Sequence, residues 1–343
     1  MDCFAYARND TWVVYFSSFN ILNINRIPHF VRDDRGVIIM SILIDKKTRI
    51  LIQGITGTEG ARACREALAY GTHVLAGVTP GKGAQKVEGV PVYDTVAEAV
   101  RKHAAINTSL IVVPGAFVKD AALEVIHARI PLVVILTEHV PTADAALILH
   151  TAWRYGVRIV GPSSIGIISP GKAKIGSIGT AEIAHVFRPG PIGVISKSGG
   201  MTAEIAVVLG RAGFGQSTVV GIGGDLIIGS DFADLLALYK DDRETRAVVL
   251  FGEVGGTYEE RVAEYIARVK FKKPVVALIA GRFAEALPEE TVLGHAGAIV
   301  ARGRGSYASK VRALKKAGVH IASSVEEIPV ILKRVVGGKN KGL

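Results

Sequence analysis

The stretch Arg49-Ile-Leu-Ile-Gln-Gly-Ile-Thr-Gly-Thr-Glu-Gly60 decides the fold class of this chain. Its first five residues form a short, β-branched run that predicts a buried strand. Glycines at 54, 57 and 60 follow, and an Ala-rich helical stretch continues to Tyr70. A strand, a glycine-rich turn and a helix in this order are typical of the phosphate-binding unit of a doubly wound parallel sheet.

Short apolar runs alternate with helical stretches after this unit. The further strands expected here are Val74–Val78, Leu110–Val113, Leu132–Leu136 and Val157–Val160, and the expected helices include Gly60–Tyr70 and Asp120–Ala128. Such alternation predicts an α/β fold with helices on both faces of a mostly parallel sheet.

A stretch rich in proline and glycine, residues 169–191, interrupts this pattern and is expected to be a linker between domains. A second α/β series follows it. Its expected strands are Ile192–Ser196, Ser217–Ile222, Ala247–Gly252 and Val275–Ala280. We therefore expect two α/β domains, over residues 40–168 and 192–343.

Residues 1–39 differ in character from the rest of the chain. The apolar run within them is mixed with Ser and Asn, and the regular α/β pattern begins only at Met40. We expect either an extension that packs on a partner or a mis-assigned start codon. No functional inference is drawn from this segment.

The net charge of +10 raises the question of nucleic-acid binding. Lys and Arg are scattered along the chain, however, and aromatic residues make up just 6% of it, which is too few for base-stacking platforms. We expect no nucleic-acid partner. A basic surface that serves polyphosphate ligands accounts for the charge more simply.

Two further features bear on the cellular setting. The cysteines, Cys3 and Cys64, are far apart and lack metal-ligand spacing, so we expect neither a disulfide nor a metal site. No apolar run reaches the length of a membrane helix. We expect a cytoplasmic protein with no membrane partner.

The glycine loop and the end of the next strand suggest a phosphorylated ribonucleotide. The spacing Gly54-x-x-Gly57-x-x-Gly60 is close to the dinucleotide fingerprint without matching it, and the alternative is a tight turn with an empty anion site. A NAD site favours an acidic residue after the second strand, whereas this chain has Lys82. Lys82 thus favours a ligand such as CoA over NAD, although a solvated loop lysine remains the alternative.

Leu136-Thr137-Glu138 ends the fourth expected strand, at the carboxyl edge where ligands of open α/β sheets bind. Glu138 either accepts hydrogen bonds from an adenine amino group or caps the next helix. The sequence leaves both roles open.

In the second unit, Ser196-Lys-Ser-Gly-Gly-Met201 lies between a strand and a helix. Hydroxyls and backbone amides in such a loop can form an anion cradle. A serine hydrolase is disfavoured because the spacing is not Gly-x-Ser-x-Gly.

Glu253 and His295 complete the candidate chemistry. Glu253 is the single carboxylate in Gly252-Glu-Val-Gly-Gly256, and His295 lies in Gly294-His-Ala-Gly-Ala298. An imidazole nitrogen attacks a phosphoryl group well when a carboxylate orients the other nitrogen, and Glu253 is the candidate for that carboxylate. The alternatives are a helix-start acceptor for Glu253 and a structural or surface histidine.

Together these motifs resemble the α-type subunit of the succinyl-CoA synthetase family, which includes citryl-CoA synthetase and the matching ligase portion of ATP-citrate lyase. The resemblance covers residues 40–336. It is carried in order by Gly-Ile-Thr-Gly-x-x-Gly, Gly-Val-Thr-Pro-Gly-Lys-Gly, Ile-Gly-Gly-Asp, Gly-Glu-Val-Gly-Gly and Gly-His-Ala-Gly-Ala.

The resemblance implies a Rossmann-like CoA-binding domain followed by a flavodoxin-like ligase domain. It implies that CoA binds at Thr56, Gly57, Thr58, Glu59, Lys82, Leu136, Thr137 and Glu138. It also implies that His295 is phosphorylated, that Glu253 is its partner, and that Ser198, Gly199 and Gly200 hold the phosphoryl group. ATP or GTP with Mg²⁺ would bind an ATP-grasp β-type subunit, so a hetero-oligomer is expected.

Three departures from the succinate pattern resemble the citrate branch instead. Ser-Arg-Ser-Gly-Thr-Leu is replaced by Ser-Lys-Ser-Gly-Gly-Met, Gly-Pro-Asn-Cys-Pro-Gly is replaced by Gly161-Pro-Ser-Ser-Ile-Gly166, and the lead into the histidine loop is longer. The sequence favours citryl-CoA synthesis, with succinate–CoA ligase as the alternative. A CoA-binding regulatory protein without catalysis is the alternative from another class, and Lys82 argues against a nicotinamide oxidoreductase.

Overall fold

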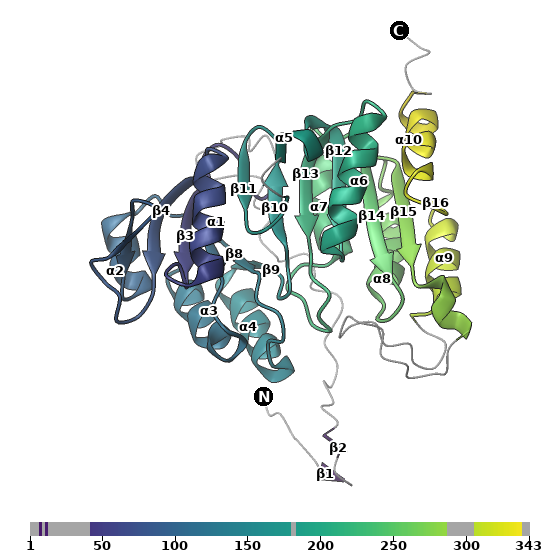
Figure 1. Cartoon of the computed structure of the whole chain (residues 1–343). Coiled ribbons are helices and arrows are strands. Elements are labelled where there is room, and N and C mark those ends of the chain that lie inside the picture. Colours follow the sequence, from purple (N-terminus) through teal and green to yellow (C-terminus); the bar gives the residue numbers. More distant parts are fainter. Residues whose placement is uncertain (1–6, 9–10, 13–41, 180–182, 287–304, 338–343) are drawn as a thin grey trace.

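The computed structural model describes residues 7–8, 11–12, 42–179, 183–286 and 305–337. Two seven-stranded sheets lie side by side, each with helices packed on its faces (Figure 1). The expected fold class, two α/β domains with mostly parallel sheets, is confirmed.

The first sheet has the strand order β5-β6-β4-β3-β7-β8-β9. Its strands are β3 (Arg49–Gln53), β4 (His73–Val78), β5 (Lys86–Val87), β6 (Val90–Tyr93), β7 (Thr108–Ile111), β8 (Leu132–Ile135) and β9 (Arg158–Val160). All neighbours pair in parallel except β5 and β6. Its helices are α1 (Thr58–Ala69), α2 (Val96–Lys102), α3 (Val118–His127) and α4 (Thr142–Tyr155).

The second sheet has the order β11-β10-β13-β12-β14-β15-β16. Its strands are β10 (Gly166–Ser169), β11 (Ala173–Ile175), β12 (Pro189–Ser196), β13 (Gln216–Gly221), β14 (Ala247–Glu253), β15 (Val275–Ala280) and β16 (His320–Ala322). The helices around it are α5 (Ile183–Val186), α6 (Gly199–Arg211), α7 (Phe232–Asp241), α8 (Tyr258–Val269), α9 (Tyr307–Lys316) and α10 (Glu327–Gly337), and a short 3-10 helix, η3 (Arg282–Ala286), follows β15.

The strands β10 and β11 pair antiparallel to each other, and β10 pairs antiparallel to β13. Strand β10 begins in the expected first domain, and β11 lies in the expected linker, residues 169–191. Both strands nevertheless belong to the second sheet. We propose a domain boundary in the segment 161–165, just before β10.

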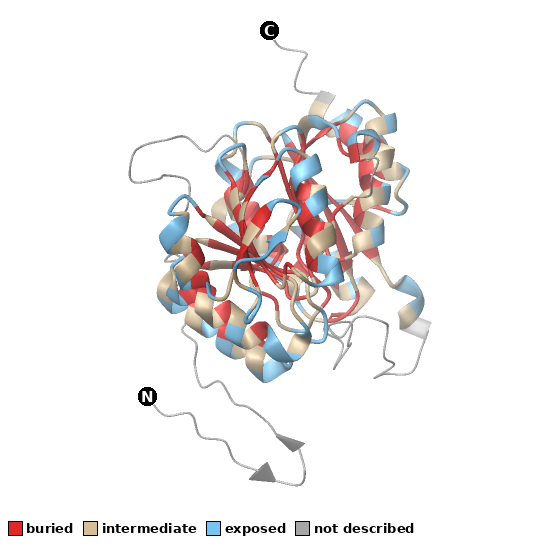
Figure 2. Cartoon of the chain, turned by 60° about the vertical axis from the view of Figure 1, so that its left-hand side comes forward, coloured by how far each residue is buried: buried red, intermediate tan, exposed pale blue. Residues whose placement is uncertain are grey.

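The strands are buried from both sides, as their β-branched composition predicts. Figure 2 shows the buried residues concentrated in the strands and the exposed ones on the outer helix faces. One hydrophobic cluster contains residues from both sheets, for example Ile50 of β3 with Ile167 of β10. Helix α1 lies beside β11 in Figure 1, and Glu66 of α1 pairs with the buried Lys174 of β11. The two domains thus share a core along α1.

Asp231 begins α7, where its Oδ1 accepts hydrogen bonds from the N–H groups of Ala233 and Asp234 at 2.8 and 3.0 Å. Burial, with the charge of Asp234, raises the pKa of Asp231 to about 7, although Arg261 acts in the opposite direction. An aspartate in the unfolded chain has a pKa of roughly 3.9, so the folded state binds this proton more tightly.

The stability of the fold is therefore expected to fall as the pH rises from about 4 to 7. One unit of pKa difference corresponds to about 1.4 kcal/mol, so the whole effect is on the order of a few kcal/mol. Asp231→Asn keeps the helix cap and removes the titration. Urea unfolding across this pH range should show the variant gaining on the wild type as the pH rises, and parallel curves would contradict the assignment.

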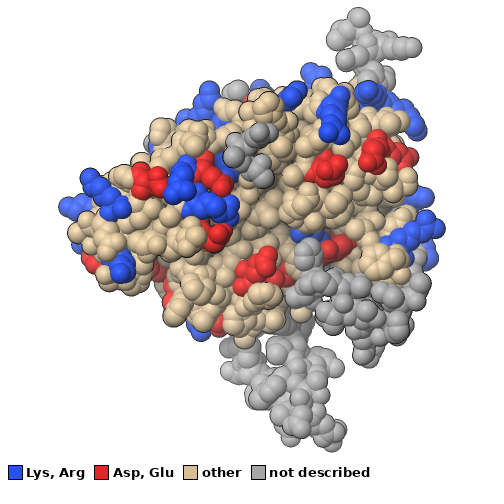
Figure 3. Space-filling view, in the orientation of Figure 1, with Lys and Arg blue, Asp and Glu red and all other residues tan. Residues whose placement is uncertain are grey.

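The N-terminal segment contributes a two-residue pair, β1 (Ala7–Arg8) with β2 (Thr11–Trp12). Among the described residues, no helix combines the length and apolar character needed to span a bilayer. Figure 3 shows Lys and Arg scattered over the face seen in Figure 1 and interspersed with Asp and Glu. No single basic patch is visible on it.

Candidate functional site

The loop after β3 is shaped by close backbone contacts. Gly54 has a φ of +83°, and a Cβ there would lie 2.7 Å from the Val112 carbonyl oxygen. A Cβ on Gly60 would lie 2.1 Å from the Gly54 carbonyl oxygen. Gly57 begins α1 with no side-chain cap, and Gly57, Thr58 and Glu59 are exposed. The first N–H groups of this helix have no intrahelical acceptors, so they face an accessible anion-binding position.

Gly60→Ala should disturb this loop. The added methyl group would force the turn away from Gly54, at a cost of roughly 1–3 kcal/mol. We expect CoA affinity to fall at least about tenfold, on the same energy scale, when measured by calorimetry. Gly210→Ala is the control, because a Cβ there meets no atom within 4 Å. Equal CoA affinity in both variants would argue against a ligand role for this loop.

Two side chains connect the loop to its surroundings. The Thr56 hydroxyl donates to Thr79 Oγ1 at 3.2 Å, which ties the loop to the end of β4. Glu59 pairs with Arg62, and the hydrogen bond and charge of Arg62 lower the pKa of the Glu59 carboxyl. Arg62 also donates to Ser177 Oγ at 3.1 Å, across to the second domain. A carboxylate beside an anion site would repel the ligand, and Arg62 offsets that charge.

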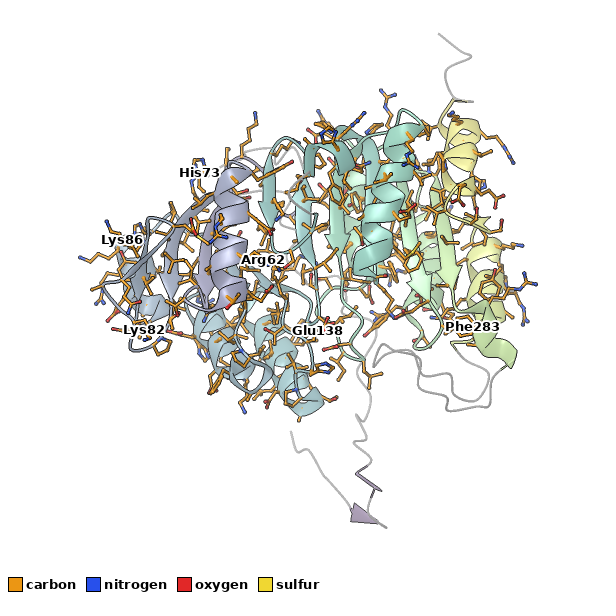
Figure 4. All side chains as sticks on the ribbon, in the orientation of Figure 1. Arg62, His73, Lys82, Lys86, Glu138 and Phe283 are labelled. Atoms are coloured by element: carbon orange, nitrogen blue, oxygen red, sulfur yellow. The ribbon has the colours of Figure 1, made fainter. Side chains whose placement is uncertain are left out.

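The other residues expected at the CoA site come to the same edge of the first sheet. Lys82 is exposed and follows β4, while Leu136, Thr137 and Glu138 follow β8. Thr137 Oγ1 donates to the Val113 carbonyl at 2.7 Å, and Glu138 is exposed. Figure 4 places Lys82 and Glu138 along the lower side of the molecule, toward which the carboxyl ends of the strands point.

The second glycine loop begins α6. Ser198 is the N-cap, and its hydroxyl oxygen accepts from the Met201 N–H at 3.4 Å. The Ser198 N–H donates to Ser196 Oγ at 3.1 Å. Gly199 is partly exposed and Gly200 is exposed. Helix α6 thus presents its positive end at the carboxyl edge of β12, as an anion cradle requires.

Glu253 ends β14, which pairs in parallel with β12 and therefore reaches the same edge. Its Oε1 lies 3.2 Å from Nζ of Lys197, whose side chain is fully buried. Its N–H donates to Oε1 of Glu259 at 3.2 Å. Glu259 is itself fully buried and paired with Lys310. Backbone and side chain of Glu253 are thus both held in place.

His295 lies outside the described residues, as do the other residues from 287 to 304. The chain before this segment leaves from β15, where the Val254 N–H donates to the Ala280 carbonyl at 3.2 Å. The chain after it returns at Gly305, whose carbonyl accepts from the Gly255 N–H at 2.8 Å. The end of β15, at Ala280, and the returning chain, at Gly305, therefore both contact the loop that follows Glu253. In Figure 4, Phe283 marks the departing end, at the lower right.

A short crossing segment, residues 161–165, links the two groups of site residues. On one side the Ser163 N–H donates to the Thr137 carbonyl at 2.9 Å. On the other side Ser164 Oγ donates to the Gly221 carbonyl at 2.6 Å. Ile165 lies close to Gly199, because a Cβ added at Gly199 would be 2.7 Å from the Ile165 side chain. The segment 161–165 therefore contacts both the sheet edge that carries Glu138 and the anion cradle at the start of α6.

Comparison with known proteins matches both halves of the chain. A CoA binding domain model matches residues 45–139, and a succinyl-CoA ligase like flavodoxin domain model matches residues 189–333. The α subunit 2 of succinate–CoA ligase [ADP-forming] from Archaeoglobus fulgidus is 44% identical over 297 residues, covering 87% of this chain and all of that protein. The chain belongs to the succinate–CoA ligase α-subunit family. The family prediction from the motifs is thereby confirmed.

Other members of the α-subunit family differ in the acid in their names. The succinate–CoA ligase α subunit of Methanothermobacter thermautotrophicus is 49% identical over 277 residues, or 81% of this chain and 91% of that one. A subunit of an ADP-forming sulfoacetate–CoA ligase from Bilophila wadsworthia is 42% identical over 298 residues, covering 87% of this chain and all of that protein.

Among solved structures, ATP citrate lyase from Methanothrix soehngenii in complex with citrate and coenzyme A superposes with a TM-score of 0.80 at 24% identity. The match covers 87% of this chain and 51% of that one, so this chain spans about half of the larger protein. At this identity the likeness concerns the fold.

The sequence motifs do not single out two residues of the second domain, Lys197 and Tyr258. Lys197 lies within the motif from Ser196 to Met201, and the ring of Tyr258 lies 5.5 Å from the Lys197 ammonium. The signal for Lys197 was available, because it directly follows a buried strand at the same edge as Glu253. The contact with Tyr258 requires the packing of α8 and has no sequence signal.

Proposed function

We propose that this chain is the α-type subunit of an NTP-dependent acid–CoA ligase that works through phosphohistidine at His295. The observation that carries the proposal is the pairing of two features at one sheet edge. The N-terminus of α6 provides a cradle for a phosphoryl group, and Glu253 lies beside it, held by Lys197 at 3.2 Å. The chain that returns from the segment with His295 contacts Gly255 through Gly305, and the end of β15, which leads into η3 and that segment, contacts Val254 through Ala280.

CoA is proposed to bind at the carboxyl edge of the first sheet. Thr56, Gly57, Thr58 and Glu59 would present the α1 N-terminus to its phosphates, and Lys82 would contact a further phosphate. Leu136, Thr137 and Glu138 would contact the adenine end of CoA. The crossing segment 161–165 would then bring the thiol end toward the α6 cradle. Binding of CoA here is consistent with the CoA binding domain that matches residues 45–139.

The proposed reaction has three steps. One imidazole nitrogen of His295 attacks the γ-phosphorus of the nucleotide and the nucleoside diphosphate leaves, while Glu253 holds the proton on the other nitrogen. A carboxylate oxygen of the acid then takes the phosphoryl group and frees the imidazole. Finally, the CoA thiolate attacks the acyl carbon of the acyl phosphate and expels inorganic phosphate. Amides at Ser198, Gly199 and Gly200 stabilise the charge of the phosphoryl group.

The nucleotide and Mg²⁺ are proposed to bind a β-type subunit with an ATP-grasp fold. This chain carries no Walker-type glycine loop followed by Lys and Ser or Thr. Relatives named as α subunits of ADP-forming ligases support a hetero-oligomer with such a partner and favour ATP over GTP. Cytoplasmic localisation is part of the same proposal.

Succinate, or another short acid, is the substrate that the relatives favour. The departure at 163–164 also has a local explanation. Ser163 has a φ of +59°, where Asn is favoured for conformational reasons, and Ser164 makes buried backbone contacts. The replacement of Asn-Cys by Ser163-Ser164 thus concerns a turn, and it is weak evidence that citrate is the substrate.

Citrate remains the second candidate because of Gly200, which replaces the usual Thr of the succinate pattern. A Cβ at Gly200 meets no atom within 4 Å, so packing does not require glycine there. The missing side chain leaves space at the exposed start of α6, next to the cradle, for a larger acid.

The test is reconstitution with a β-type subunit and γ-labelled ATP. We expect acid-labile, base-stable label on this chain and none on His295→Ala. The labelled complex is then mixed with CoA and either succinate, citrate or sulfoacetate, and the acid that discharges the label as acyl-CoA is the substrate. Absence of label on the wild-type chain would contradict the proposal. A CoA-binding regulatory protein would instead bind CoA equally well in both forms without labelling.

A further inference from the structure

Lys197 is a charged residue in a buried position. Its side chain is fully buried, and its backbone lies between the end of β12 and the start of α6. Burying an ammonium group without compensation costs several kcal/mol, so such groups are paired in stable proteins. Among the described residues, its ion-pair partner is Glu253, with Nζ 3.2 Å from Oε1.

The backbone brings this pair together. Ser196 of β12 stands opposite Phe251 of β14 in parallel register, and the Lys197 N–H donates to the Phe251 carbonyl at 3.1 Å. The side chains of Lys197 and Glu253 therefore leave the sheet at the same edge. Neither strand can shift relative to the other without breaking these ladder contacts.

Tyr258 supports Lys197 from the side. The Lys197 ammonium lies 5.5 Å from the centre of the Tyr258 ring, and the Arg261 guanidinium lies 5.9 Å from the same centre. The Tyr258 hydroxyl donates to the Leu226 carbonyl at 3.0 Å, which fixes the ring at its other end. The ring thus contributes a cation–π contact that favours one place for the ammonium.

We propose that Lys197 is a positioning residue for the ligase reaction, which fixes the Glu253 carboxylate and balances its charge. The inference rests on the proposed function, in which Glu253 orients His295. A free carboxylate beside the α6 cradle would repel an arriving phosphoryl group. An ammonium 3.2 Å from Oε1 offsets that repulsion, and the ion pair restrains the carboxylate in one position.

A purely structural ion pair is the competing explanation, and the chain offers an example of one. Lys310 and Glu259 are both fully buried and pair with each other between α9 and α8. Glu259 of that pair accepts a hydrogen bond from the backbone N–H of Glu253, whereas Lys197 forms an ion pair with the Glu253 side chain. The two explanations therefore differ in whether the effect of Lys197 depends on the Glu253 carboxylate.

The experiment measures the single-turnover rate of phosphoprotein formation in the complex with a β-type subunit and γ-labelled ATP. The variants are Lys197→Met, Lys197→Arg, Glu253→Gln and the double variant Lys197→Met/Glu253→Gln. We expect Lys197→Met to slow labelling about 10- to 100-fold, in the range seen for residues that orient a reacting group. Lys197→Arg, which keeps the charge, should recover most of the rate.

The double variant separates positioning from stability. If Lys197 acts through the Glu253 carboxylate, Lys197→Met should change the rate by less than about threefold in the Glu253→Gln background. The matched control is Lys119→Met, which breaks another lysine–carboxylate pair, with Asp144 at 3.0 Å in the first domain, and should leave labelling unchanged. Melting temperatures and CoA affinities are measured for every variant.

Two results would overturn the role of Lys197 alone. The first is wild-type labelling with an unchanged rate in Lys197→Met. The second is equal slowing in both backgrounds together with a lowered melting temperature. Absence of label on the wild-type chain would overturn the proposed function and this role with it. If Lys197→Met does not fold, Lys197→Gln and Lys197→Arg provide the same comparison.

Discussion

Glu253→Gln is expected to slow phosphorylation of this chain on the order of 10²–10⁴-fold, the range for groups that set the protonation state of a catalytic imidazole. In the proposed mechanism, the carboxylate holds a proton on one imidazole nitrogen and stabilises the positive charge that forms when the other nitrogen is phosphorylated. A glutamine side chain has the same shape but no charge. Its amide can also turn its NH₂ group toward the ring, which favours the wrong tautomer.

The measurement is the same single-turnover labelling, with His295→Ala as the zero reference. Gln has nearly the same size and shape as Glu, and the backbone of residue 253 is held by Glu259 in either form, so the fold should be retained. CoA affinity should not change, because the residues proposed to bind CoA lie at the edge of the first sheet, within the region that the CoA binding domain model matches. A Glu253→Gln protein that labels within about threefold of the wild-type rate would remove Glu253 from the mechanism.

Lys310→Met is expected to lower the free energy of unfolding by roughly 3–5 kcal/mol, because it leaves Glu259 buried without its partner. Lys310 is fully buried on α9, and its ammonium also donates to the Gly256 carbonyl at 3.1 Å. Glu259 approaches the sheet so closely that a Cβ on Gly252 would lie 2.5 Å from its Oε1. There is little room for water to replace the lost contact.

Urea unfolding of the isolated chain measures this effect. The control is Arg65→Met, which breaks a pair between Arg65 and Glu88 whose side chains are 64% and 33% exposed, and should cost less than about 1 kcal/mol. Lys310→Met/Glu259→Gln should recover part of the loss, because a neutral amide costs less to bury than a carboxylate. Similar losses in Lys310→Met and Arg65→Met would show that the buried pair has no special weight.

Strands with a continuous apolar run were predictable. The expected strand at 49–53 coincides with β3, and the one at 275–280 coincides with β15, because each has an uninterrupted run of buried aliphatic residues, Ile50 to Ile52 in β3 and Val275 to Ile279 in β15. The short strands β5, β6, β10, β11 and β16 of the two large sheets escaped prediction. Each contains only two to four residues and lies near a sheet edge, where the backbone pairing of neighbours decides strand formation more than composition does.

The site followed the same division. The glycine loops at 54–60 and 198–200 were predictable, since a strand, a tight turn and a helix place their amides at a sheet edge wherever they occur. The contact between Lys197 and Glu253 was not. The two residues are 56 positions apart in the sequence. They meet because β12 and β14 are parallel neighbours, with Lys197 and Glu253 at their carboxyl ends.

The sequence by itself determined the fold class, the family and the two glycine-rich turns between a strand and a helix, because these depend on local runs of residues. The tertiary structure decided that β10 and β11 belong to the second sheet, that α1 lies between the two sheets, and that the crossing segment 161–165 joins the two groups of site residues. It also decided that Lys197 is buried against Glu253 and Tyr258. Burial and charge pairing arise from contacts between segments far apart in the chain, and no local pattern encodes them.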